Sequence, residues 1–111
     1  MTKNVNIDGS KIADWDSFHD VFSEALGFPA FYGRNMNAWI DCMTSLDSPE
    51  DGMSKVHVSP EDVLVLCVSG VQEFRARCPE IYNSLIECSA FVNWRRIELG
   101  DPAVLALSFY D

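Results

Sequence analysis

The run of residues 63–68 constrains the fold most, because it is apolar at every position (Val-Leu-Val-Leu-Cys-Val). A strand with one face in water alternates apolar and polar residues, whereas a strand in the middle of a parallel sheet is apolar on both faces. Two other strand-like segments lie on either side of it in sequence, at Asn4–Asp8 and Ala103–Tyr110. We therefore expect residues 63–68 to be the central strand of a small parallel sheet.

The segment between the first two strands has the spacing of two helices. Asp14 or Asp16 can cap the first helix, and Gly27 can end it. The second helix is predicted to begin after Asn35, a good N-cap residue, and to run to about Ser45.

Two more helices are predicted between the second and third strands, at Val71–Arg77 and from Pro79 to just before Gly100. The polar, turn-rich residues 47–62 interrupt the chain, with Lys55–Val58 as a small edge strand. The order strand–helices–strand–helices–strand predicts an α/β fold, a small three-stranded parallel sheet covered by helices.

Length and composition predict one domain over residues 1–111, since 48% hydrophobic residues suffice for one core at this size. No apolar run is long enough to span a membrane, and the first residues do not resemble a signal peptide, so we expect a cytoplasmic protein. The four cysteines have no zinc-site spacing, and we expect free thiols, no metal and no cofactor: Cys42, Cys67, Cys78 and Cys88.

The chain carries 8 basic and 17 acidic residues, a formal net charge of −9. Such a surface repels phosphate backbones, which argues against nucleic-acid binding. It favours a basic partner protein, although a merely well-solvated surface explains the charge equally well. The one basic cluster, Trp94-Arg95-Arg96, lies near a predicted helix C-terminus, where cations stabilise the helix dipole.

The sequence does not predict an enzyme. Glycine-rich phosphate loops and the Gly-x-Ser-x-Gly motif are absent from the sequence. His19 and His57 have no obvious nucleophile beside them, and adjacent carboxylates such as Glu61-Asp62 fit turns and helix caps better than acid–base catalysis.

Residues 28–46 carry the most information about function. At 100° per residue the apolar side chains of this segment form one stripe that we expect in the core: Met36, Trp39, Met43 and Leu46. Another face carries an amide, a carboxylate and a hydroxyl, with an apolar side chain at its margin: Asn37, Asp41, Thr44 and Ile40. Phe31 and Gly33, in the preceding loop, extend this face.

Two interpretations of this face are open. In one, the helix and its preceding loop present a compact surface to a partner. In the other, Ile40 packs under a neighbouring helix and Asp41 is an ordinary solvated acid.

The segment from Phe31 to Thr44 (Phe-Tyr-Gly-Arg-Asn-Met-Asn-Ala-Trp-Ile-Asp-Cys-Met-Thr) resembles the loop and second helix of the barstar family, intracellular inhibitors of ribonucleases. Asn6–Gly9 and Ala25–Pro29 resemble the beginning of that family as well. The resemblance implies an α/β domain with a three-stranded parallel sheet and no catalytic activity.

The resemblance also implies a partner-binding set on this loop and helix: Phe31, Gly33, Asn35, Asn37, Ile40, Asp41 and Thr44. In the family, the carboxylate at the position of Asp41 enters the phosphate-binding pocket of the ribonuclease, among basic side chains. The implied partner is a basic ribonuclease or toxin, and the implied role is that of a bacterial immunity protein that is monomeric when free.

Several positions depart from the family pattern. The family has tyrosine where Phe31 stands, aspartate at Asn37, tryptophan at Ile40 and an acid at Arg34. It also uses an acidic residue late in the chain, for which Glu87 is the candidate here. These departures support an alternative function, an interaction or regulatory module of the same fold that binds a partner other than a nuclease.

Overall fold

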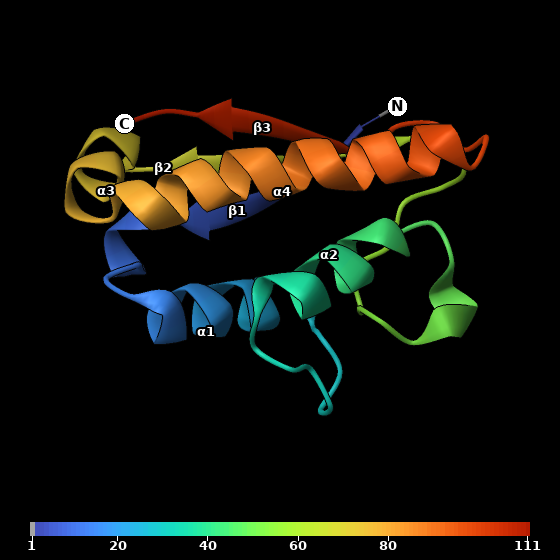
Figure 1. Ribbon diagram of the computed structural model, residues 1–111, viewed down its shortest axis with the longest axis horizontal. Coiled ribbons are helices and arrows are strands. Elements are labelled where there is room, and N and C mark those ends of the chain that lie inside the picture. Colours follow the sequence, from blue (N-terminus) through green and yellow to red (C-terminus); the bar gives the residue numbers. More distant parts are fainter. Residues whose placement is uncertain (1) are drawn as a thin grey trace.

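The computed structural model describes residues 2–111. Its centre is a three-stranded parallel sheet in the order β1 (Thr2–Asp8), β2 (Val63–Ser69), β3 (Leu105–Phe109) (Figure 1). The apolar run therefore forms the middle strand, and the predicted α/β fold is confirmed.

Helices make both connections between the strands (Figure 1). β1 is followed by η1 (Gly9–Lys11, a 3-10 turn), α1 (Trp15–Leu26), α2 (Met36–Thr44) and η2 (Pro49–Asp51, a 3-10 turn). β2 is followed by α3 (Val71–Arg77) and the long α4 (Pro79–Glu98). None of the helices within residues 2–111 is both long and apolar enough to cross a membrane.

The helices cover one face of the sheet and leave the other open. In β2 the residues at 64, 66 and 68 are buried, while those at 63, 65 and 67 are only half-buried. The strand order explains this. The connections from β1 to β2 and from β2 to β3 cross the sheet in the same direction, and two right-handed crossovers in one direction place their helices on the same face. β2 is apolar on both faces, although only one of its faces is fully buried.

Local capping sets the ends of α1. The Asp14 carboxylate accepts a hydrogen bond from Ser17 N at 2.8 Å, so Asp14 and not Asp16 is the N-cap. Gly27 ends the helix with a φ of 67°, a left-handed conformation that glycine adopts without strain.

Residues 47–62 do not contain the predicted edge strand at Lys55–Val58. The Lys55 and Val56 amides instead donate to Leu26 O, and the Val58 amide donates to Leu46 O. These bonds tie the segment to the C-terminal end of α1 and to the residues just after α2, and not to a strand of the sheet.

Trp39 fixes how α2 packs. Its side chain is fully buried, with its ring centroid 5.7 Å from that of Phe22 in an edge-to-face arrangement. Met43 and Leu46 are also fully buried and Met36 is partly buried, which confirms the predicted core stripe.

A buried ion pair joins the end of α2 to α4. The Arg96 guanidinium donates two hydrogen bonds to the Asp47 carboxylate, at 3.0 and 2.8 Å. It also donates to Thr44 O at 2.8 Å and to Pro102 O at 2.9 Å. The Arg96 side chain is only 5% exposed. The prediction that Arg96 has a structural role is confirmed, and its partners also include a carboxylate.

We expect Asp47→Ala to lower the free energy of unfolding by about 3 kcal/mol, because it leaves a buried guanidinium without its counter-ion. This loss is at the lower end of the range for breaking a buried ion pair, because Arg96 keeps its two carbonyl acceptors. Urea denaturation measures it, with Asp51→Ala as the exposed control expected to cost less than about 0.5 kcal/mol. Equal losses in the two variants would contradict this assignment.

The Asp47–Arg96 pair also predicts a pH dependence. The hydrogen bonds from Arg96 hold the pKa of Asp47 below its ordinary value. The pair therefore contributes its full stability above the unfolded pKa of about 4 and loses it as the pH falls through the folded pKa. We expect the stability difference between wild type and Asp47→Ala to shrink as urea denaturation is repeated at decreasing pH below about 4. A difference unchanged by pH would show that the charge of Asp47 is not what stabilises the fold.

Candidate partner-binding surface

The outer face of α2 carries polar side chains, as its periodicity predicted. Asn37 and Asp41 are exposed one helical turn apart, and Thr44 is partly buried. The Asp41 side chain is 59% exposed, so its carboxylate faces solvent and not the core. These three residues do share one side of the helix.

Asn35 shapes the junction between the preceding loop and α2. Its side-chain oxygen accepts a hydrogen bond from Ala38 N at 2.8 Å, which caps the helix as predicted. Its side-chain nitrogen donates to Gly33 O at 3.3 Å, which links the cap to the loop. Phe31 lies further back in this loop with 72% of its surface exposed.

Side chains of α1 hold the loop in place. The Tyr32 hydroxyl lies 2.6 Å from His19 Nδ1, and burial lowers the pKa of His19 and raises that of Tyr32. Arg34 has a φ of 54° and pairs with Asp20 at 2.9 Å, while also donating to Asp16 O at 3.0 Å. The loop therefore meets α2 as an anchored segment, with the Arg34 charge directed to α1.

Ile40 does not belong to the exposed face. It is 9% exposed and joins the hydrophobic core, as in the interpretation that packs Ile40 inward, so little of this side chain is offered to a partner. Its position between the core stripe and the polar face is consistent with this burial.

Asp41 has a basic neighbour from α4. Arg95 donates from one guanidinium nitrogen to Asp41 Oδ1 at 3.2 Å and to Thr44 Oγ1 at 2.6 Å. Thr44 Oγ1 in turn donates to Ile40 O at 2.6 Å, in its own helix. A connected group of Asp41, Arg95 and Thr44 therefore stands at the junction of α2 and α4.

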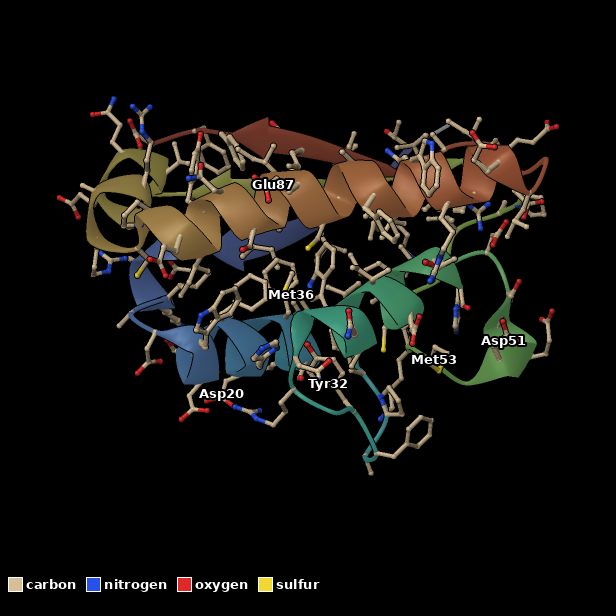
Figure 2. The ribbon with its side chains drawn as sticks, in the orientation of Figure 1. Asp20, Tyr32, Met36, Asp51, Met53 and Glu87 are labelled. Carbon is tan, nitrogen blue, oxygen red and sulfur yellow. The ribbon has the colours of Figure 1, made fainter. Side chains whose placement is uncertain are left out.

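This group borders a shallow depression of about 420 Å³. The segment after α2 contributes the other side of the depression with Asp51 and Met53 (Figure 2). Sequence reasoning identified neither residue, because residues 47–62 have no periodicity that predicts which side chains approach α2. The polar stretch therefore forms part of the candidate surface.

The sequence predicted that Arg95 stabilises the dipole of its helix, and Glu87 was the candidate for the acidic residue from late in the chain that joins the partner-binding surface. Glu87 lies two turns before Arg95 on α4 (Figure 2), about 12 Å along the axis at 1.5 Å per residue. The α4 residue in contact with Asp41 is basic. No signal in the sequence indicated this, since the contact joins residues 54 positions apart.

Across residues 2–111, no group of three or more His, Cys, Asp and Glu side chains is placed to hold a metal ion. The four cysteines are free. The outer side of α2 is therefore a surface of hydrogen-bonding and charged groups.

A sequence model of one family, described as barstar (barnase inhibitor), matches residues 2–102. The chain belongs to the barstar family. The match extends past the first half of the chain to the turn before β3.

A protein of Bacillus subtilis (strain 168), named putative ribonuclease inhibitor YrdF, is 38% identical over 42 residues. The aligned part covers 38% of this chain and 46% of that protein, less than half of its length.

We expect Asn35→Ala to lower the free energy of unfolding by about 1 kcal/mol, because it removes the N-cap of α2. Asn35→Asp, which keeps an acceptor oxygen, should retain most of this stability. Asn37→Ala is the matched control on the exposed face and should change stability by less than about 0.5 kcal/mol. Thermal and urea unfolding measure the three variants. If Asn35→Ala has the same free energy of unfolding as the wild type, the cap does not stabilise the helix.

Proposed function

We propose that this chain binds the active site of a partner ribonuclease with α2 and the loop before it, and so blocks access of RNA without catalysing a reaction itself. The observation that carries the proposal is the exposed carboxylate of Asp41 on α2, in a member of the barstar family. A carboxylate can accept charge-assisted hydrogen bonds from the arginine and lysine side chains that otherwise bind an RNA phosphate.

The other groups of the surface support such contacts. Asn37 and Gly33 offer hydrogen bonds at the rim, and exposed Phe31 offers apolar area. The net charge of −9 would speed encounter with a basic enzyme, as opposite charges steer diffusing proteins together. As a bacterial immunity protein, the chain would act as a monomer in the cytoplasm of the cell that makes the ribonuclease.

The alternative, a module that binds a partner other than a nuclease, has a specific observation in its favour. Burial of Ile40 and the pairing of Asp41 with Arg95 both reduce what α2 offers to a basic pocket. A protein partner with mixed charge would meet this surface better than a pocket lined only by cations.

The test is inhibition of RNA cleavage by a panel of secreted bacterial ribonucleases that includes barnase, with a fluorogenic RNA substrate. We expect at least one enzyme to be inhibited at near-stoichiometric concentrations. Asp41→Ala should weaken that inhibition by about thirtyfold or more, because loss of a central charged contact costs about 2 kcal/mol or more.

Asp41→Ala should leave the fold stable, since an exposed ion pair contributes about 0–1 kcal/mol. Glu24→Ala removes the same charge from an exposed position on α1, outside the candidate partner-binding surface. This variant should inhibit like the wild type. If no enzyme in the panel is inhibited, a non-nuclease partner becomes the better hypothesis. If the two variants inhibit equally, inhibition does not depend on Asp41 and the proposed contact of its carboxylate is wrong.

A further inference from the structure

Arg95 places a positive charge next to the carboxylate that the proposed function needs. The Arg95 side chain is 33% exposed, and its guanidinium is held at two points, by Asp41 Oδ1 and by Thr44 Oγ1. Because Thr44 is itself bonded to the backbone of α2, Arg95 cannot leave the surface without losing a 2.6 Å hydrogen bond.

A partner cation that reaches Asp41 therefore also approaches Arg95. Two like charges brought together at a desolvated interface repel strongly, and this repulsion is a common source of specificity between proteins. A carboxylate on the partner would remove the penalty, since it could take the exposed side of the Arg95 guanidinium while the neighbouring cation takes Asp41.

We propose that Arg95 sets the partner specificity of this surface: it selects a ribonuclease that presents a carboxylate beside the basic group met by Asp41, and it weakens binding to one whose facing surface is basic throughout. This inference rests on the proposed function and names the partner chemistry of the same surface.

The depression beside Arg95 fits a partner group of mixed charge. It contains two acids, Asp41 and Asp51, around the one arginine, with Met53 as apolar lining. A cation and a carboxylate held side by side on the partner would each find an opposite charge within this small area.

Barnase is the probe, because the family is described as barnase inhibitors. The resemblance also implies that the carboxylate at the position of Asp41 enters a phosphate-binding pocket among basic side chains. Dissociation constants would be measured by titration calorimetry for the wild type, Arg95→Gln and Arg95→Glu. We expect Arg95→Glu to bind barnase at least about tenfold more tightly than the wild type, with Arg95→Gln between them.

Arg75→Glu is the matched control. It makes the same change in net charge at an exposed position on α3. Figure 1 shows that α3 lies at the opposite end of the molecule from the C-terminal end of α2. We expect it to change the dissociation constant by less than about threefold, since long-range effects on affinity are screened by salt. Circular dichroism and thermal unfolding would verify that each variant is folded.

Three results would overturn the inference: weaker barnase binding by Arg95→Glu, an effect equal to that of Arg75→Glu, or no binding by any of the proteins. These outcomes are separate from failure of the proposed function. Inhibition of some ribonuclease through Asp41, with no selective effect of Arg95, would leave the function standing and remove only the role of Arg95. Gain of barnase binding by Arg95→Glu, with no ribonuclease inhibited by the wild type, would remove the proposed function and the selection of a ribonuclease, and would leave only the effect of Arg95 against basic partners.

Discussion

The ion pair between Arg96 and Asp47 is the interaction on which the candidate surface depends. It joins α4 to the residues just after α2, and the same guanidinium also binds the backbone of Thr44 and of Pro102. Trp39 holds the inner side of α2 in the core. With one side buried and its end tied down, α2 presents its outer face in a single orientation, which spares a partner the entropic cost of ordering it.

Adjacent arginines on α4 consequently have different roles. Arg96 points inward and is almost completely buried, whereas Arg95 lies at the surface beside Asp41. The first stabilises the fold and the second changes the charge of the surface that the fold presents. The carboxylate that the proposed function places in a phosphate pocket is therefore paired with an arginine of its own chain.

Much of the fold was predictable because local chemistry decides it. Asn35 caps α2, the 3.6-residue spacing places Trp39 and Met43 inside, and the apolar run of β2 lies at the middle of the sheet. The prediction of an edge strand at 55–58 was wrong. Its apolar alternation is only four residues long, and its amides donate instead to the carbonyls of Leu26 and Leu46. The sequence left two interpretations of Ile40 open, because periodicity gives its angle on the helix but not how far the core extends around it; the structure buries it.

The sequence alone determined the order of strands and helices, the cap and core side of α2, and the acid at Asp41, because each follows from residues within a few turns of one another. The tertiary structure alone decided that the sheet is covered on one face and that Arg95, 54 residues away from Asp41, supplies its neighbour. It also decided that Asp51 and Met53 border the same depression. Contacts of this kind depend on how α4 and residues 47–62 are placed against α2, and that placement is set by packing of the whole core and not by any local pattern.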